Sequence, residues 1–380
     1  MIESIQTDPN FMHITWNDGV KSQFHFQWLR ENCHSSSTRH PGTHQRLLEY
    51  RDYPDDLAPI RYDFNHEKLS VTWNHNQHHS EYSFQWLRKH SNDAESRKQR
   101  KFQPKLWKPA QAEYFAIHDY PSITTDDKAK FSCLSDFLHN GFVRIANAPN
   151  VDGTVVKTIS LFGFVRETNY GKYFEVWSEA NPEHLANSNR ALSIHTDNLY
   201  RLSTPSVQAL HCLNSSMEGG ESTMVDGFRA AEDFRKDHPE LFEHLLRIPV
   251  AFTYSSKSEH LYQRKPLISV DYDGVLQTAF INERVMAPLD LPAVDQKNFY
   301  DAFRVYQCYV YDPAYTFTFK MNAGDIMIFN NHRMFHGRKA IQPQKEGKRH
   351  LQGCYGDIDG FFSRYRVLAR EFAPENGQLY

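Results

Sequence analysis

Two potential metal ligands, His195 and Asp197, lie two positions apart in the string LSIHTDN. Because side chains two apart on an extended segment point to the same side, both could bind one metal ion. A single pair of this kind is a weak signal, since the chain has 21 histidines and 46 Asp and Glu residues. A third candidate, His336, follows in the string NNHRMFHGR, directly after a predicted strand over 325–329.

Together, His195, Asp197 and His336 could form a triad of two histidines and one carboxylate. Such a triad leaves coordination positions of an Fe(II) ion open for a bidentate 2-oxo acid and for O2, as in the non-haem iron oxygenases. Arg349 follows His336 after a short interval and begins another strand-like segment. Its planar guanidinium suits the distal carboxylate of 2-oxoglutarate. The spacing therefore predicts an iron centre with a 2-oxo acid co-substrate.

These side chains need a scaffold of strands. The hydrophobic pattern predicts strands over 206–212, 222–225, 316–321, 325–329 and 350–355, and helices over 131–139, 151–162, 230–247, 293–309 and 361–369. The strands do not alternate with an equal number of helices, which argues against a doubly wound parallel sheet. We therefore expect a mainly β catalytic domain, with a two-sheet core and flanking helices.

The first 90 residues contain an internal repeat. The strings ITWN at 14–17 and FQWLR at 26–30 recur as VTWN at 71–74 and FQWLR at 84–88. Each copy is expected to form a strand, a polar turn and a second strand that ends on Trp-Leu-Arg. The following segment is highly charged and carries two prolines. We predict a small β-rich N-terminal domain over 1–90, a linker or crossing segment over 91–112, and the catalytic domain over 113–380.

Composition excludes several function classes. The 380 residues include 43 Lys and Arg against 46 Asp and Glu, so bulk charge would not attract nucleic acid or an anionic membrane. No apolar segment reaches the ~18 residues of a membrane-spanning helix, and the first residues lack the features of a signal peptide. Five cysteines without a CxxC pair argue against a disulfide framework. We expect a cytoplasmic protein that binds neither nucleic acid nor membranes.

Several strings, in this order, resemble the γ-butyrobetaine hydroxylase branch of the TauD-like Fe(II)/2-oxoglutarate dioxygenases. They are WLRENC at 28–33, VRETNYG at 165–171, HTDN at 195–198, HC at 211–212, GG at 219–220, VDGF at 225–228, FHGR at 335–338, and RH at 349–350 with GCY at 353–355. The resemblance implies a double-stranded β-helix (jelly roll) catalytic domain. It assigns Fe(II) to His195, Asp197 and His336, and the carboxylate of 2-oxoglutarate to Arg349, with the hydroxyl of Ser222 on the same co-substrate.

The same resemblance implies that a small trimethylammonium zwitterion is hydroxylated at an unactivated C–H, with release of succinate and CO2. Such enzymes hold the quaternary ammonium group in a box of aromatic rings, by cation–π attraction. The positions that match the box are Tyr170, Phe174, Tyr355 and Asn187, the last of which is usually a tyrosine. Candidates for the anionic end of the substrate are Asn198, Arg201 and Asn282. An arginine with amide donors suits a carboxylate or a phosphonate, so γ-butyrobetaine and 2-(trimethylammonio)ethylphosphonate both stay open.

Three alternatives are a trimethyllysine hydroxylase, a hydroxylase of protein side chains, and a jelly-roll binding protein without catalysis. In the family, the N-terminal domain often binds zinc, and Cys33 and either His78 or His79 correspond to its ligands. A tetrahedral site needs four protein ligands, which Cys33, His34 or His40, His44 and His78 could supply. A metal-free module packed around its tryptophans is the other interpretation. We also expect a homodimer, in which this small β-rich module contributes dimer contacts or covers the mouth of the active site.

Overall fold

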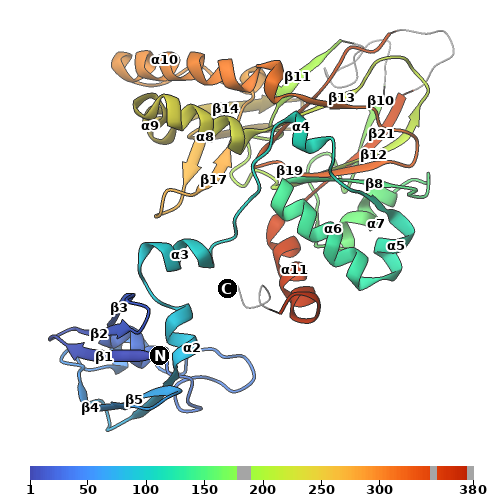
Figure 1. Cartoon of the computed structure of the whole chain (residues 1–380). Helices are drawn as coiled ribbons and strands as arrows, with labels where there is room; N and C mark the ends of the chain where they lie inside the picture. Colours follow the sequence, from blue (N-terminus) through green and yellow to red (C-terminus); the bar gives the residue numbers. More distant parts are fainter. Residues whose placement is uncertain (178–189, 343–348, 375–380) are drawn as a thin grey trace. The chain divides into compact units, whose positions relative to one another are not determined.

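The computed structural model describes residues 1–177, 190–342 and 349–374 (Figure 1). The chain divides into two compact units, Met1–Gln103 and a second unit that begins at Pro104. The division falls within the 91–112 segment, which carries the short helices α3 (Ala94–Arg100) and α4 (Pro109–Ala112). Asn187, the polar position expected in the aromatic box, lies outside the described residues.

The N-terminal unit contains the same element order twice, three antiparallel strands followed by a short helix. The first copy consists of β1 (Ile2–Thr7), β2 (Phe11–Trp16), β3 (Lys21–His25) and α1 (Phe26–Glu31). The second consists of β4 (Pro59–Phe64), β5 (Lys68–Trp73), β6 (His79–Ser83) and α2 (Phe84–Lys89), with a 3-10 turn η1 (Tyr50–Asp52) between the copies. Burial alternates along β2 and β5 in the same way, so both sheets turn one face to the core.

The two Trp-Leu-Arg strings do not end strands, as the sequence pattern suggested, but lie within α1 and α2. The side chains of His25 and Ser83 cap these helices by accepting hydrogen bonds from backbone N–H groups of the first turn. Capping at this point ends the strand and starts the helix. In α1 the buried residues Phe26 and Leu29 are three positions apart, which is helical spacing. The aromatic composition of the strings had favoured a strand.

The two copies make reciprocal contacts. The ring of Phe26 packs against Trp73 at 6.2 Å, and the ring of Phe84 packs against Trp16 at 6.1 Å. Within each copy, the indole N–H donates to a buried serine hydroxyl, Trp16 to Ser22 and Trp73 to Ser80. The core of this unit is therefore shared by both copies.

Two sheets form the centre of the second unit, and all their ladders are antiparallel except the β7–β8 pair. The seven-stranded sheet has the order β10-β21-β12-β19-β8-β7, with β9 paired to β21, and the four-stranded sheet has the order β11-β20-β13-β18. The strands of the larger sheet are β7 (Ile117–Asp119), β8 (Phe142–Ala146), β9 (Val165–Arg166), β10 (Phe174–Trp177), β12 (Val207–Ser215), β19 (Ile326–Asn330) and β21 (Arg349–Gly356). Those of the smaller sheet are β11 (Leu192–His195), β13 (Ser222–Asp226), β18 (Phe317–Phe319) and β20 (Met334–Arg338).

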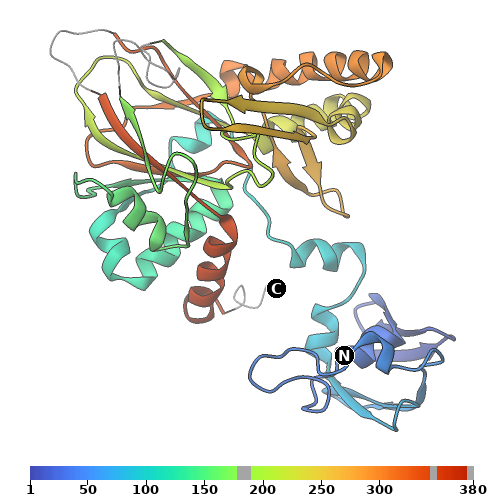
Figure 2. The same ribbon diagram turned by 180° about the vertical axis from the view of Figure 1, so that it is seen from behind.

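Helices and two hairpins surround these sheets (Figure 1 and Figure 2). One group packs around the seven-stranded sheet and consists of α5 (Tyr120–Thr125), α6 (Asp127–Asn140), α7 (Thr154–Ser160) and α11 (Ile358–Phe372). A second group consists of α8 (Gly227–Asp237), α9 (Pro239–Arg247) and α10 (Ala293–Val310). The hairpins β14 (Val250–Ser255) with β15 (His260–Lys265) and β16 (Ile268–Val270) with β17 (Leu276–Ala279), and the 3-10 turns η3 (Glu283–Val285) and η4 (Pro313–Tyr315), complete the unit.

The expected fold class, a mainly β catalytic domain with flanking helices and a small β-rich N-terminal domain, is confirmed. The helix predicted over 230–247 is two helices, because Pro239 lacks an N–H and starts α9 at its first turn. In the part of the chain that the structure describes, no helix is long and apolar enough to cross a membrane.

A buried ion pair joins the core to the segment that opens this unit. Arg333 and Asp226 form two hydrogen bonds of 2.8 and 2.9 Å, and both side chains are 1% exposed. Arg333 also donates to the backbone carbonyls of His139 and Lys105, and Asp226 accepts from the backbone N–H of Trp107. The buried pair and its backbone partners therefore link four chain segments, at positions 105–107, 139, 226 and 333.

Candidate active site

The three predicted metal ligands converge between β11, β20 and the loop that follows β11. His195 on β11 and His336 on β20 are register partners, and their ring centroids lie 4.3 Å apart. Asp197 Oδ1 is 3.2 Å from His195 Nε2, and Asp197 Oδ2 is 4.0 Å from His336 Nε2. One ligand atom from each of the three lies within 4.8 Å of the others, and no other group of this kind occurs among the described residues.

The protonation of the triad suits a divalent cation. Burial and the neighbouring His195 lower the pKa of His336 to about 3, so its imidazole is neutral at neutral pH. Burial alone would raise the pKa of Asp197, but the adjacent His195 and His336 rings and the hydrogen bond from Tyr355 hold it well below its usual range. His195 Nδ1 lies 2.9 Å from the carbonyl of Ser193, which can only accept, so Nδ1 carries the proton and Nε2 is free for a metal.

The donor set therefore fits Fe(II), which prefers imidazole and carboxylate ligands in this combination. His195, Asp197 and His336 would hold the ion. The hydroxyl of Tyr355 donates to Asp197 Oδ2 at 3.0 Å, so the carboxylate has a further partner that fixes its orientation.

A cavity of about 100 Å³ extends from the triad into the space between the two sheets. Ser222 on β13 and Arg349 on β21 both line it, as the co-substrate prediction requires. Burial and the positive charge of Arg338 lower the pKa of Arg349 to about 10, so the guanidinium stays charged at neutral pH. Among the described residues Arg349 has no ion-pair partner. A charged, unpaired and largely enclosed guanidinium suits a carboxylate ligand.

A second cavity, of about 270 Å³, opens beside the triad. Five of the predicted substrate residues line it, namely Tyr170, Phe174, Asn198, Asn282 and Tyr355. Arg201, the other residue predicted for the anionic end of the substrate, is not in this lining. Its guanidinium donates to the side-chain oxygens of Asn198 and Asn169 and so braces two loops.

Aromatic rings form a continuous wall of this cavity. Phe174 and Tyr170 lie 6.3 Å apart with ring planes at 59°, and Tyr170 and Tyr254 lie 6.2 Å apart at 66°. Adjacent rings at such angles form the sides of a box. Two further rings stack on these and extend the wall, Tyr355 on Phe174 at 5.1 Å and Tyr200 on Tyr254 at 5.0 Å.

The sequence analysis missed Tyr200 and Tyr254. Tyr200 lies only three positions after Asp197, and its hydroxyl is 3.0 Å from that of Tyr170. Nearness to the metal-ligand motif could have indicated it. Tyr254 comes from the β14–β15 hairpin, which no motif marks.

The sequence analysis also missed Arg284, a cation in the same lining. It lies in the η3 turn, two residues after Asn282. Burial lowers the pKa of Arg284, while the nearby Asp197, Tyr311 and Glu283 groups oppose that shift. Because Arg284 lines the cavity and Arg201 does not, Arg284 is the stronger candidate for the anionic end of a substrate.

Asn282 has a structural task as well as a place in the lining. Its amide Nδ2 donates to the backbone carbonyl of Thr196 at 2.9 Å, and the side chain is 7% exposed. Its Oδ1 is buried without a hydrogen-bond partner among the described residues. Asn282 therefore holds Thr196, the residue next to Asp197. A contact with substrate would use its Oδ1 or the second N–H of its Nδ2.

Among the described residues of the N-terminal unit, no three potential metal ligands come together. Cys33 Sγ lies 3.4 Å from His78 Nε2, but His34, His40 and His44 do not join them in a metal-ligand cluster. Burial and the positive charge of the nearby Arg30 lower the pKa of His78 to about 4. That charge would also repel a bound cation. The pair forms a hydrogen bond within a core of aromatic rings.

Comparison with known proteins gives consistent similarities along the chain. Residues 98–355 match the family described as taurine catabolism dioxygenase TauD, TfdA family, and residues 4–74 and 60–124 match the gamma-butyrobetaine hydroxylase-like N-terminal family. The chain is 31% identical to the gamma-butyrobetaine dioxygenase of Pseudomonas sp. (strain AK-1), over 94% of this chain and 93% of that protein. It is 32% identical to the trimethyllysine dioxygenase of Meyerozyma guilliermondii, over 95% and 94% of the two chains. It is 30% identical to the human gamma-butyrobetaine dioxygenase, over 97% and 96%.

Proposed function

Because the chain belongs to the TauD/TfdA dioxygenase family and carries a gamma-butyrobetaine hydroxylase-like N-terminal domain, we propose that it hydroxylates a small trimethylammonium zwitterion at an unactivated C–H bond. It is an Fe(II)/2-oxoglutarate-dependent dioxygenase. Bound Fe(II) supplies the oxygen chemistry, in which O2 gives one atom to the hydroxylated substrate and one to succinate as 2-oxoglutarate loses CO2.

The residues of this chain bind and orient the reactants. His195, Asp197 and His336 hold the metal at the junction of the two cavities. Arg349 and Ser222 bind the distal carboxylate of 2-oxoglutarate in the inner cavity. The substrate enters the outer cavity, where its position relative to the metal decides which carbon is hydroxylated.

One observation carries the substrate proposal: the outer cavity is lined both by angled aromatic rings and by a guanidinium. The rings of Tyr170, Phe174 and Tyr254 suit a poorly hydrated cation, since each ring face attracts it by ~0.5–2 kcal/mol. Arg284 suits an anion, and Asn198 lines the same cavity. A ligand that carries both charges would satisfy both features.

We propose γ-butyrobetaine and 2-(trimethylammonio)ethylphosphonate as the two leading substrates. Arg284 favours the phosphonate, because three oxygens and up to two negative charges accept more charge-assisted hydrogen bonds than a carboxylate does. Trimethyllysine is the third candidate, since several relatives are named trimethyllysine dioxygenases. Its free α-ammonium group would be repelled by Arg284, and Glu175, an acidic residue of the lining, is already paired with His350 at 2.5 Å.

The test is a screen for substrate-dependent succinate release by protein loaded anaerobically with Fe(II). The three candidates are compared with neutral analogues in which a tert-butyl group replaces the trimethylammonium group. Size and shape are nearly unchanged, so loss of cation–π attraction should weaken binding of the neutral analogue at least about tenfold. Equal binding of charged and neutral ligands, or succinate release with none of the three, would contradict the proposal.

The homodimer and the cytoplasmic location stay predictions from the sequence, as do the domain boundaries at 90 and 113. Light scattering coupled to size-exclusion chromatography tests the first of these predictions directly.

A further inference from the structure

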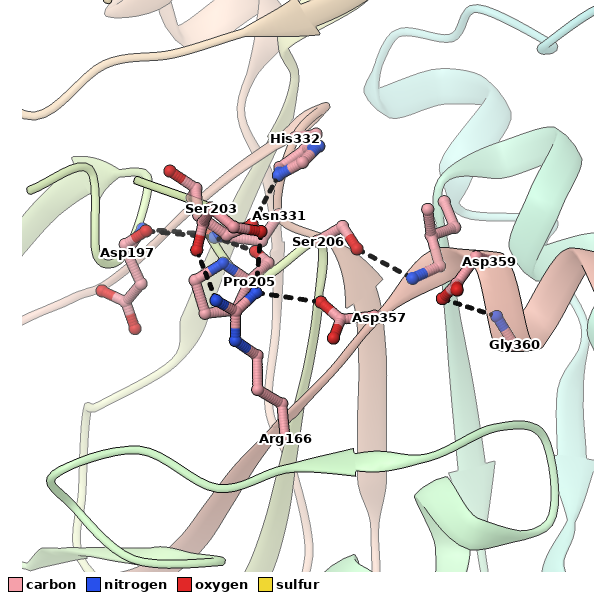
Figure 3. Close-up of polar contacts among 12 residues, drawn as sticks. Arg166, Asp197, Ser203, Pro205, Ser206, Asn331, His332, Asp357, Asp359 and Gly360 are labelled. Atoms are coloured by element: carbon pink, nitrogen blue, oxygen red, sulfur yellow. Dashed lines mark hydrogen bonds and ion pairs between the residues drawn. The ribbon is translucent and has the colours of Figure 1, made fainter. Parts of the chain in front are cut away.

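Asn331, in the turn between β19 and β20, has a fully buried side chain that pairs with the backbone of a metal ligand. Its Oδ1 accepts a hydrogen bond from the N–H of Asp197 at 3.0 Å, and its Nδ2 donates to the carbonyl of Asp197 at 3.1 Å (Figure 3). The second N–H of the same amide donates to the carbonyl of Pro205 at 2.9 Å. The carboxamide thus makes the pair of backbone hydrogen bonds that a neighbouring strand would make if Asp197 lay in a sheet.

Asp197 needs such a partner because it lies on a loop. The two histidine ligands are held by the β11–β20 ladder, whereas Asp197 follows the end of β11. The next residue, Asn198, has a φ of 59°, a left-handed conformation that non-glycine residues seldom adopt. Among the described residues, Asn331 makes the only hydrogen bonds to the backbone of Asp197 itself.

Asn331 also connects the loop to the third ligand. It lies five positions before His336, in the turn that joins β19 of the larger sheet to β20 of the smaller sheet. A metal site tolerates displacement of its ligands by only about 0.5 Å. We propose that Asn331 is a positioning residue, which fixes Asp197 relative to His336 and thereby sets the affinity of the site for its metal. This inference rests on the metal site and not on the identity of the substrate.

The same network provides a matched control. His332, the next residue, donates through Nε2 to the carbonyl of Thr204 at 2.9 Å and so anchors the far end of the loop (Figure 3). Arg166 holds that end as well, through the carbonyl of Ser203 at 2.7 Å and through Asp357 at 3.0 Å. His332 is therefore adjacent in sequence and holds the same loop, but it does not contact Asp197.

The experiment compares Asn331→Ala, Asn331→Asp and His332→Gln. Isothermal titration with Mn(II) alone gives the metal Kd, and thermal unfolding without metal gives stability. Asn331→Ala should raise the Kd for Mn(II) by about 10–100-fold, as other losses of a ligand's supporting partner do. Asn331→Asp keeps the acceptor for the Asp197 N–H but turns a carboxylate toward two carbonyls, so it should also weaken metal binding. His332→Gln should lower the melting temperature while changing the Kd by less than about threefold.

An unchanged Kd in the folded Asn331 variants would overturn the proposal. So would an equal rise in Kd in His332→Gln at a similar loss of melting temperature, because Asn331 would then act only through general loop stability. If Asn331→Ala gives no folded protein, Asn331→Asp carries the same comparison. Because Mn(II) binding requires neither substrate nor turnover, the outcome is independent of the proposed function.

Discussion

His195 and His336 face each other across two paired strands, with their ring centroids 4.3 Å apart. Strand β11 is the edge of its sheet, and its ladder with β20 has an irregularity between Leu192 and His195. Strand pairing, rather than a loop, thus determines the separation of the two imidazoles. A metal site built in this way is formed before the metal binds.

Replacement of either histidine should therefore abolish metal binding while the protein stays folded. We expect His336→Ala and His195→Ala to lose the rise in melting temperature that Mn(II) gives the native protein, since a ligand stabilises only the state that binds it. His260→Ala, at an exposed position on β15, is the control. A normal Mn(II)-dependent shift in either ligand variant would disprove the triad.

Arg349→Ala should chiefly raise the requirement for 2-oxoglutarate. Loss of the guanidinium leaves the carboxylate of the bound co-substrate unpaired in the inner cavity, at a cost of about 2–5 kcal/mol. That cost corresponds to a rise of at least about 30-fold in the 2-oxoglutarate KM. Arg349→Lys should retain part of the affinity. If the Arg349→Ala enzyme saturates with co-substrate as the native enzyme does, another residue binds the carboxylate.

Arg284→Met should weaken substrate binding and leave the 2-oxoglutarate KM unchanged. Methionine fills much of the same space without the charge, so the anionic end of the substrate loses its main partner. We expect the substrate KM to rise at least about tenfold, and more for the phosphonate than for the carboxylate. Arg201→Met, outside the cavity lining, is the comparison. A larger effect there would reassign the anion site.

Tyr254→Leu should weaken binding of the cationic substrate by ~0.5–2 kcal/mol but hardly affect its neutral tert-butyl analogue. Leucine keeps apolar contact and removes the ring face. Tyr300→Leu, an exposed position on α10, controls for general effects. Equal losses for both ligands would mean that Tyr254 contributes only hydrophobic contact.

Asp226→Ala should destabilise the catalytic unit by about 3–5 kcal/mol, because it leaves the charge of Arg333 buried without a partner. Asp301→Ala breaks an exposed pair with Lys297 and should cost no more than about 1 kcal/mol. Urea denaturation at equilibrium measures both. A cost for Asp226→Ala close to that of Asp301→Ala would show that the pair is not needed to hold its four chain segments together.

The sequence could predict the metal ligands because two of them are close neighbours in one short motif and the third lies in a second motif. His195 ends β11 and Asp197 follows it two residues later, while His336 is carried by β20, the strand that pairs with β11. The lining of the outer cavity depends instead on how distant elements pack. Tyr254 comes from a hairpin that no motif marks, and Arg284 from a 3-10 turn two residues after the predicted Asn282. Arg201 lies near the triad in sequence, but it donates to Asn198 and Asn169 and does not line the cavity.

The differences between the predicted and the observed elements have similar causes. Each Trp-Leu-Arg string has the composition of a strand, yet a side-chain cap just before it starts a helix. The division between α8 and α9 could have been predicted from Pro239, since proline interrupts a helix except in its first turn. Asn331 gives no signal in a single sequence, because its partner lies 134 positions away.

The reciprocal contacts of the N-terminal unit have the symmetry of a twofold dimer contained in one chain. Phe26 meets Trp73 as Phe84 meets Trp16, which is the isologous pattern of two identical subunits. One copy alone would leave its phenylalanine and tryptophan without these partners, so neither copy is an independent folding unit. The contact between a phenylalanine of one copy and a tryptophan of the other therefore occurs twice in the unit. A substitution at Phe26 removes one member of the pair, and its twin at Phe84 remains.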